Sequence, residues 1–385
     1  TTQQEKAAAN FLCETLQELG YAVEQEPFKG SSSAGARILI HLAVATVGLC
    51  CLPWNPVYTG VLGFLALLSL HLESSTRFVL LSRPISLSNS QNVVAKHPAK
   101  SGKAKRRLII CAHYDTQRTA KLWQKLHDTS HQRTSPVQAG TTKSPMFPLV
   151  IAMLLQIFAG GISWLLALPI VGYTVGGLAL VIYIVASLSL GDWATGKFVP
   201  GCNDNASGVA TALALARKDT NEFPIDMELI FLFPGCEESV CMGSAAWLDT
   251  HRKMLLEVPT VFLNLDTLGN GTPRFMGAEH SMTGQKVRYS SELLGKCSHI
   301  ARQMELSEDA FATPVHGDGF AFIVRGFQGA SLTSRHLNGS IPHYHLPTDN
   351  YDTIDLEIAW QSTLFAESLF HNMCVDPTWF KPTSA

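Results

Sequence analysis

The sequence predicts an α/β protein with a mainly parallel mixed sheet, helices on both faces of that sheet, and two inserted transmembrane helical hairpins. Apolar strand-like runs alternate with helical patterns, which is typical of parallel sheets covered on both sides. Two long apolar stretches, each almost free of charged residues, interrupt this pattern. The 385 residues suffice for one large domain or two ordinary ones.

The α/β part begins with an amphipathic helix over residues 3–20, which ends at Gly20. Residues 21–26 then alternate in polarity like an edge strand. Further strands are expected at residues 92–96, 107–113, 227–233, 260–265 and 328–333. Helices are expected at residues 207–217, from 239 onward, and at 355–373.

The two apolar stretches each contain two segments of near-membrane length. Residues 36–52 and 56–72 form the first pair, and residues 146–168 and 170–190, broken at Pro169, form the second. A helix needs about 20 apolar residues to cross a bilayer. Buried core helices are the alternative for any one segment, but two back-to-back pairs favour membrane hairpins. The chain is therefore expected to be an integral membrane protein with four spans.

These hairpins make the α/β domain discontinuous. The expected catalytic or binding domain comprises residues 1–35, 73–145 and 191–385, with hairpin one at 36–72 and hairpin two at 146–190. Each hairpin returns to the side from which it left, and the returning flanks are rich in Lys and Arg whereas the tips have none. The positive-inside rule then predicts a cytoplasmic domain. Residues 118–143 are expected to form a polar, basic loop, either a solvated linker or a contact with anionic lipid headgroups.

Charge and cysteine content exclude several classes. A formal net charge of −2 gives no general attraction to nucleic acid. The nine cysteines include no CxxC pair, so free thiols are expected rather than a disulfide framework. Four spans without an intramembrane charge, and with His41 as their one imidazole, argue against an ion-transport pathway.

Five stretches place acidic or imidazole side chains just after an apolar strand or in a nearby loop. They are LIICAHYDT with His113 and Asp115, VPGCNDNASGVA with Asp204, FLFPGCEES with Glu237 and Glu238, VFLNLDTLG with Asp266, and PHYHLPTDN with His345. Sites in open α/β sheets form at the carboxyl ends of strands. These stretches are therefore expected to converge on one crevice.

Nitrogen and carboxylate ligands suit zinc, and the lack of cysteine ligands argues against a closed structural site. Two cations bridged by one carboxylate would use five such groups, and a pair of metals activates water and polarises a carbonyl. One of the adjacent glutamates would then bind metal while the other acts as general base. Asp115 would accept a hydrogen bond from the His113 imidazole. Each group alone also has a purely structural explanation, such as a helix cap.

The segments AHYDT, GCNDNASGVA, CEESVCMGS, LNLDTLG and YHLPTDN resemble the co-catalytic zinc exopeptidases of metallopeptidase family twenty-eight. Bacterial aminopeptidases, glutamate carboxypeptidases and glutaminyl cyclases belong to this family. The resemblance covers the α/β part and implies the zinc-exopeptidase fold with two zinc ions. It implies Asp204 as a bridging ligand, followed by a cis peptide at Asn205, Glu237 as general base, and Asp115 as the residue that orients His113. The implied metal ligands are His113, Asp204, Glu238, Asp266 and His345.

The resemblance is weaker on the substrate side. HGDGFAF is similar to the family's Ser-Asp-His segment, with Asp318 at the aspartate, but Gly317 and Gly319 stand in place of serine and histidine. Tyr344 precedes the last ligand, as in many peptidase members, whereas the cyclases tend to have tryptophan there. Arg335 is a candidate partner for a substrate carboxylate, and an arginine in an exposed loop is the alternative.

The resemblance implies a di-zinc metallopeptidase that hydrolyses a peptide-type amide, as an exopeptidase of aminopeptidase-like type. The two hairpins depart from the family pattern, and they are expected to anchor this enzyme in a membrane. Hairpin two ends shortly before Asp204, so the active site is expected near the bilayer surface. The expected substrate is then amphiphilic: a hydrophobic peptide, the tail of a membrane protein, or an acylated amino acid. The alternatives are a glutaminyl-cyclase-like aminoacyltransferase with one zinc and a non-catalytic scaffold of a membrane complex. Aminopeptidase or carboxypeptidase action, and the oligomeric state, are left open.

Overall fold

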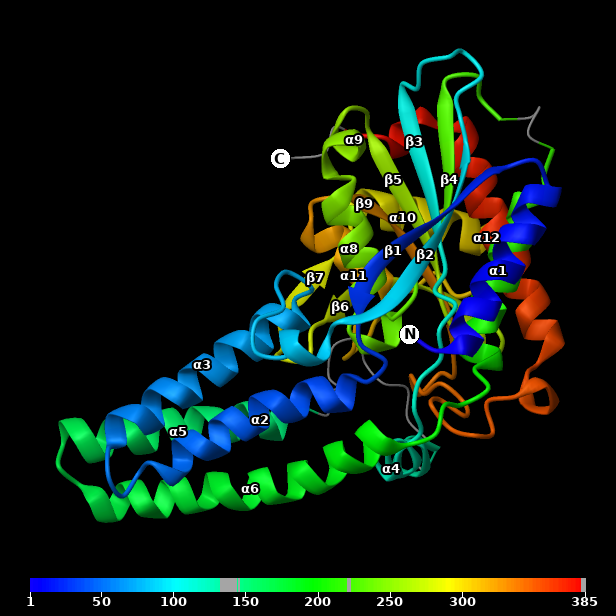
Figure 1. The fold of residues 1–385 in the computed structure, drawn as a ribbon. Coiled ribbons are helices and arrows are strands. Elements are labelled where there is room, and N and C mark those ends of the chain that lie inside the picture. The colour runs from blue at the N-terminus through cyan, green and yellow to red at the C-terminus, as the bar shows by residue number, and fades with distance from the viewer. Residues whose placement is uncertain (132–143, 145, 220–222, 382–385) are drawn as a thin grey trace.

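The computed structural model describes residues 1–131, 144, 146–219 and 223–381, and it shows a globular α/β part joined to a long helical arm (Figure 1). One sheet of nine strands runs through the globular part in the order β1-β2-β4-β3-β5-β9-β6-β7, with β8 beside β6. The strands are β1 Ala22–Gly30, β2 Ser88–His97, β3 Arg106–Cys111, β4 Met227–Phe233, β5 Thr260–Leu265, β6 Thr272–His280, β7 Lys286–Arg288, β8 Phe311–Ala312 and β9 Gln328–Arg335.

The centre of the sheet is parallel and its margins are mostly antiparallel. Strand β3 runs parallel to β4 and β5, and β5 runs parallel to β9. Antiparallel pairs β1·β2, β2·β4, β6·β9 and β6·β7 extend the sheet on both sides. The predicted mixed sheet is therefore confirmed, and its centre is parallel, but antiparallel pairs are as numerous as parallel ones, so the sheet is not mainly parallel. The first predicted strand lies at the edge.

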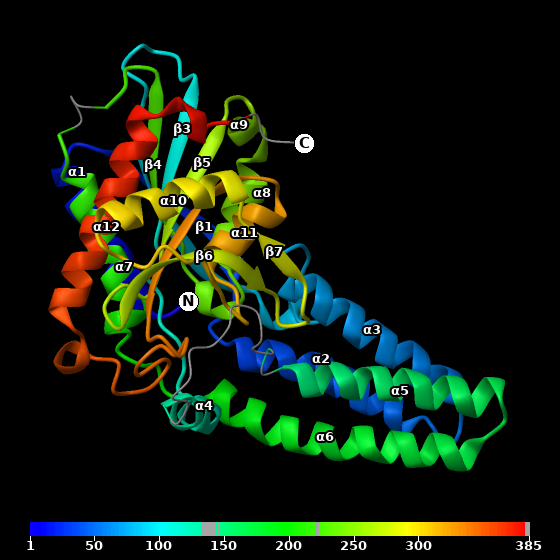
Figure 2. The ribbon, with the colours of Figure 1, turned by 180° about the vertical axis from the view of Figure 1, so that it is seen from behind.

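Helices cover both faces of the sheet because successive strand residues point to opposite sides. Leu108 and Ile110 of β3 pack in the cluster formed with α1, α7, α10 and α12, whereas Ile109 packs in the cluster with α8, α9 and α11. Figure 2 shows α10 and α12 across one face. These helices are α1 Gln3–Glu18, α7 Ser207–Ala216, α8 Met242–Thr250, α9 Arg252–Leu256, α10 Ser291–Gln303, α11 Asp318–Val324 and α12 Leu356–Val375.

The helical arm is built from the two predicted hairpins, packed side by side. Its helices are α2 Ala34–Cys50, α3 Pro56–Ser74, α5 Phe147–Leu165 and α6 Pro169–Thr195. Small residues allow close packing: a Cβ on Gly48 or Gly63 would meet the Gln156 side chain at 2.7 or 3.0 Å. The Gln156 amide donates to the Thr59 carbonyl and accepts from the Tyr183 hydroxyl, so this buried polar group is partnered.

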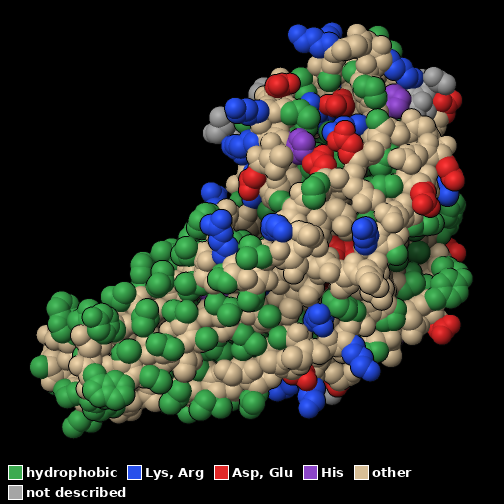
Figure 3. Space-filling view, viewed as in Figure 1, with side chains coloured by type: hydrophobic (Ala, Val, Ile, Leu, Met, Phe, Trp, Pro, Cys, Tyr) green, Lys and Arg blue, Asp and Glu red, His purple; other side chains and the backbone are tan. Residues whose placement is uncertain are grey.

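The outer surface of the arm is apolar (Figure 3). Ile170 is 79% exposed and Leu188 is 73% exposed, as are many neighbouring large hydrophobic side chains. Helices α3, α5 and α6 are long and apolar enough to cross a membrane, by length and composition, whereas α2 is a shorter apolar helix of 17 residues. Three helices thus meet the length expected of a span, where the sequence predicts four. Lys and Arg side chains gather where the arm joins the globular part (Figure 3).

The predicted loop over residues 118–143 is wrong in its first half. Residues Lys121–His131 form helix α4, while residues 132–143 lie outside the described part of the chain. Leu122 and Trp123 of α4 pack into the hydrophobic cluster that runs through the arm. This apolar contact explains why a segment with a polar sequence is helical.

Short turns complete the fold. They are Arg83–Ile85, Cys202–Ala206, Glu237–Ser239, Tyr351–Thr353 and Pro377–Trp379. Two of them, Cys202–Ala206 and Glu237–Ser239, carry predicted site residues.

Candidate metal centre

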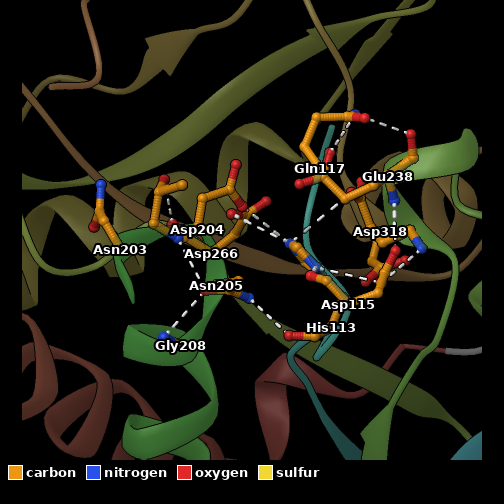
Figure 4. Close-up of polar contacts among 12 residues, drawn as sticks. His113, Asp115, Gln117, Asn203, Asp204, Asn205, Gly208, Glu238, Asp266 and Asp318 are labelled. Carbon is orange, nitrogen blue, oxygen red and sulfur yellow. Dashed lines mark hydrogen bonds and ion pairs between the residues drawn. The ribbon is translucent and has the colours of Figure 1, made fainter. Parts of the chain in front are cut away.

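The predicted ligands meet at the carboxyl-terminal edge of the parallel strands. His113 follows β3, Glu237 and Glu238 follow β4, and Asp266 directly follows β5. Asp204 lies in the turn that leads into α7, and His345 lies in the loop after β9. Parallel strands present their carboxyl ends on one edge, which is why residues distant in sequence converge there. Figure 4 shows the carboxylates of Asp204 and Asp266 beside the His113 ring.

The ligands form two groups of three that share Asp204. The first group is His113, Asp204 and Asp266; the second is Asp204, Glu238 and His345; within each group one ligand atom per residue lies within 4.8 Å of the others. Asp204 Oδ1 is 3.3 Å from His113 Nε2, and Asp204 Oδ2 is 3.2 Å from His345 Nε2. The two oxygens of one carboxylate thus face two histidines, which is the arrangement of a bridging ligand.

Buried atoms without hydrogen-bond partners show that the site fits metal ions. Both ring nitrogens of His345 and Oε1 of Glu238 are buried and accept or donate no hydrogen bond within the described chain. Burying such groups unpartnered is costly, so an unsatisfied set of nitrogen and carboxylate atoms that converge indicates a cation site. Imidazole and carboxylate donors are those that zinc takes.

The electrostatics of the site point the same way. Burial raises the pKa of Glu237 well above its ordinary range and raises the pKa of Glu238 to about 7. Burial alone would lower the pKa of His113, but the surrounding carboxylates, first among them Glu237, outweigh it and raise that pKa well above its usual value. Bound cations would stabilise the ionised carboxylates and the neutral imidazole that ligation requires.

Asp115 supports the site differently from the prediction. Its carboxylate accepts hydrogen bonds from the backbone amides of Glu237 at 2.9 Å and Glu238 at 3.2 Å. His113 Nδ1 lies 3.2 Å from the Asp115 backbone carbonyl and 3.6 Å from its Oδ1. The carboxylate therefore fixes the turn that carries the two glutamates, and the imidazole hydrogen bond goes to the backbone of the same residue.

Gln117, Asp349 and Asn205 hold the site through hydrogen bonds, and sequence reasoning missed these roles. Gln117 donates to Glu238 Oε2 at 2.8 Å. Asp349 accepts from the backbone amides of Asn203 at 2.7 Å and Asp204 at 3.1 Å.

Asn205 accepts from the amides of Gly208 and Thr267 and donates to the Leu265 carbonyl. Figure 4 shows its contact with Gly208. The peptide bond between Asp204 and Asn205 is cis, as the resemblance implies. The position of Asp349 within PHYHLPTDN was the available signal, whereas nothing in the sequence marked Gln117.

A cavity opens beside both groups of ligands. Glu237, Tyr344 and Arg335 line it, whereas Asp318 lies behind it, close to Glu237 and Cys241. Tyr344 stacks on His345 with ring centroids 3.6 Å apart. One apolar wall belongs to the hydrophobic cluster of the arm and comprises Trp123, Met146, Trp193, Val240, Met282 and Tyr344.

Arg335 is buried at the end of β9, not exposed in a loop. It is 8% exposed, its guanidinium lies over the Phe311 ring at 5.2 Å, and Nε has no hydrogen-bond partner among the described residues. No carboxylate of the described chain lies within 4 Å of it. A buried, unpaired cation in a cavity wall is free to meet an anionic group.

Close neighbours explain why Gly317 and Gly319 stand where the resembling family segment has serine and histidine. A Cβ at Gly319 would lie 2.3 Å from the Tyr289 hydroxyl oxygen and 2.9 Å from Glu279 Oε1. The Tyr289 hydroxyl donates to Glu279, so this pair fills the space that a side chain at 319 would need. At Gly317, a Cβ would lie 3.0 Å from Asp266 Oδ2.

Comparison with known proteins agrees with this geometry. Residues 187–369 match the family model described as Peptidase family M28. Aminopeptidase YwaD of Bacillus subtilis (strain 168) is 38% identical over 72 residues, which are 19% of this chain and only 16% of that protein.

Solved structures show the same fold at low identity. BSAP, a zinc aminopeptidase from Bacillus subtilis, has a TM-score of 0.54 at 14% identity and covers 99% of this chain and 92% of its own. Porphyromonas gingivalis glutaminyl cyclase has a TM-score of 0.52 at 14% identity, over 96% of this chain and 91% of its own. The described chain therefore has the fold that these enzymes share.

Proposed function

We propose, on the premise that this chain is a zinc-dependent hydrolase of the M28 type with the zinc-exopeptidase fold, that it is a membrane-anchored di-zinc exopeptidase. The observation that carries this is the pair of ligand groups sharing Asp204, with Glu237 beside them and in neither. Zinc ions bound there would supply an activated water and polarise the scissile carbonyl. The ligands would be His113, Asp204 and Asp266 for one ion, and Asp204, Glu238 and His345 for the other.

Glu237 is the proposed general base. Its carboxylate lines the cavity, and Oε2 lies 3.9 Å from His113 Nε2, within the centre but outside both ligand groups. It takes a proton from the attacking water and passes that proton to the leaving nitrogen, so the amide and water yield a carboxylic acid and an amine. A buried carboxylate with a raised pKa is suited to holding that proton between the two steps.

The completeness of the second ligand group favours a two-ion hydrolase over an aminoacyltransferase with one zinc. Asp204 offers one oxygen to each group, and His345 keeps both of its ring nitrogens free of hydrogen bonds. A protein that bound one ion at saturation would favour the transferase instead.

The cavity supports a hydrophobic or acylated substrate. Its wall of Met146, Trp193, Val240 and Met282 continues into the apolar cluster of the helical arm. The unpaired guanidinium of Arg335 lines the same cavity, and it is the proposed partner of a substrate carboxylate. An acylated amino acid or a hydrophobic peptide carries both features. Tyr344 would flank the scissile bond. Asp318 would not touch the substrate, and it would influence the reaction through the neighbouring carboxylate of Glu237.

The arm is the proposed membrane anchor, with all four helices inserted and the globular part on the cytoplasmic side. Its exposed apolar surface and the cationic residues at its base support this placement (Figure 3). Alkaline carbonate washing should leave the protein in the membrane fraction, and detergent should release it. Release by carbonate alone would contradict insertion.

A substrate screen tests the function. Zinc-loaded protein in lipid would be offered N-acyl amino acids, hydrophobic peptides with free amino termini, and short soluble peptides, with Glu237→Gln as the inactive control. The proposal expects cleavage of amides and a preference for the hydrophobic substrates, lost in the control. Equal rates for wild type and Glu237→Gln would refute the assignment of the base. Equal rates on soluble and acylated substrates would refute the substrate class alone.

A further inference from the structure

We infer that both hairpins of the arm position the turn Glu237–Ser239, and that Arg37, Gln117 and Trp193 act as positioning residues for the ligand Glu238. This inference rests on the proposed metal centre. It concerns contacts made by the inserted segments themselves, which no part of the proposed chemistry requires. The turn carries both the proposed base and a proposed ligand, so its placement decides the geometry of each.

The turn needs outside support because its backbone is strained. Cys236 before it has φ of 53°, and Val240 after it has φ of 74°. Positive φ is unfavourable for any residue with a Cβ, and for a β-branched residue such as valine it is rare. Such conformations cost on the order of 1–3 kcal/mol each and persist where surrounding contacts enforce them.

Helix α6, which continues beyond hairpin two to Thr195, supplies a directed hydrogen-bond chain to Glu238. Trp193, in the last turn of α6, donates from its indole Nε1 to Gln117 Oε1 at 3.0 Å. Gln117 Nε2 then donates to Glu238 Oε2 at 2.8 Å and to the Glu238 carbonyl at 3.1 Å. The same Gln117 Oε1 also accepts from the backbone N–H of Arg118 at 2.8 Å. Because both N–H groups can only donate, they fix the amide with its oxygen toward Trp193 and its NH₂ toward Glu238. Both side chains are buried, which keeps water from replacing either bond.

Hairpin one is hydrogen-bonded to the other end of the same turn. Arg37, in the first turn of α2 and 2% exposed, donates from one guanidinium nitrogen to the Ser239 carbonyl. Its other nitrogens donate to Ser82 Oγ at 3.2 Å and to Glu73 Oε2 at 3.1 Å. Glu73 belongs to the end of α3, so the guanidinium is held by both helices of the hairpin while it reaches the turn.

The contacts from Gln117 and Arg37 position Glu238, a proposed ligand with one carboxylate oxygen, Oε1, that has no hydrogen-bond partner in the described chain. Glu238 Oε2 accepts from Gln117 and lies 3.3 Å from His345 Nε2. Outer hydrogen bonds of this kind orient ligands, and their loss weakens metal binding by about 10–100-fold. The expected consequence is confined to the ion held by Asp204, Glu238 and His345, because the His113 group contains no residue of the turn.

Trp193→Phe tests this, since it keeps the aromatic packing and removes the N–H. Detergent-solubilised protein would be titrated with zinc against a competing chelator, and with cobalt(II) followed by absorbance. One of the two ions should bind about 10–100-fold more weakly and the other should be unchanged. Trp247→Phe is the matched control, because the indole N–H of this buried tryptophan has no partner in the described chain and its ring packs in the cluster with α8, a helix that does not line the cavity.

Gln117→Met extends the test to the middle residue of the hydrogen-bond chain from Trp193 to Glu238. The double variant with Gln117→Met and Trp193→Phe should bind zinc no more weakly than either single variant, because both changes interrupt the same series of hydrogen bonds to Glu238. Arg37→Lys, which keeps a cation beside Glu73, should weaken the same ion. If the variants lose thermal stability while both zinc affinities equal those of Trp247→Phe, the inference is overturned. A wild-type protein that binds fewer than two ions would instead refute the proposed function.

Discussion

Replacing Asp115 should destabilise the turn that carries the two glutamates. Its carboxylate accepts from two successive backbone amides, at 2.9 and 3.2 Å. A hydrogen bond to a charged group contributes about 1.5–3 kcal/mol, so two give an upper bound of about 6 kcal/mol. The Asp115 side chain is 13% exposed, so water replaces part of the loss. We expect Asp115→Ala to lower the free energy of unfolding by about 3 kcal/mol and Asp115→Asn, which keeps one acceptor, by about half of that.

The assay compares apparent Tm values of zinc-free proteins in the same detergent, because bound metal would add its own stabilisation. In a chain of this size, about 3 kcal/mol corresponds to a fall in Tm of roughly 5 °C. Asp309→Asn is the matched control, since Asp309 is exposed and has no hydrogen bond or ion pair in the described chain. The reasoning fails if Asp115→Ala melts with the control, or if Asp115→Asn is the more damaging change.

The other predictions concern the shared ligand and one close backbone approach. Asp204→Ala removes the common member of both ligand groups, so it should abolish binding of both zinc ions, and retention of two ions would contradict the bridging role. Gly208→Ala would place a Cβ 2.3 Å from Asn205 Oδ1 and 2.4 Å from the Leu265 carbonyl, so we expect a stability loss of about 1–3 kcal/mol or more. Its control is Gly295→Ala, in a helix with open space around it, which should be neutral or slightly stabilising. Equal Tm values for the two variants would show that the approach at Gly208 is not tight.

The sequence predicts the centre better than it predicts its supports. His113, Glu237 and Asp266 follow apolar strands whose parallel arrangement brings their ends together, so local patterns determine both the elements and the place of these residues. Gln117 donates to Glu238, which is 121 positions away, and Asp349 accepts from the backbone amide of Asn203, 146 positions away. Contacts of that range leave no local pattern from which their roles could be inferred.

The remaining differences also arise from tertiary contacts. Helix α4 forms because Trp123 packs against the arm, although its sequence is polar overall. Strands β6, β7 and β8 were not predicted, and they extend the sheet beyond β9 through pairing with each other and with β9. Arg335 is the last residue of β9, and it is buried because that strand lies inside the sheet between β5 and β6.

The most direct test of a two-zinc hydrolase with Glu237 as its base is to measure zinc content and turnover together, on wild type and Glu237→Gln. Glu237 belongs to neither ligand group, so the substitution should leave both ions in place. We expect two zinc ions per chain in both proteins and amide hydrolysis in the wild type, reduced by at least about 10²-fold in Glu237→Gln. A Glu237→Gln protein that keeps two ions and hydrolyses at the wild-type rate, or a wild type that saturates with one ion, would contradict the proposal.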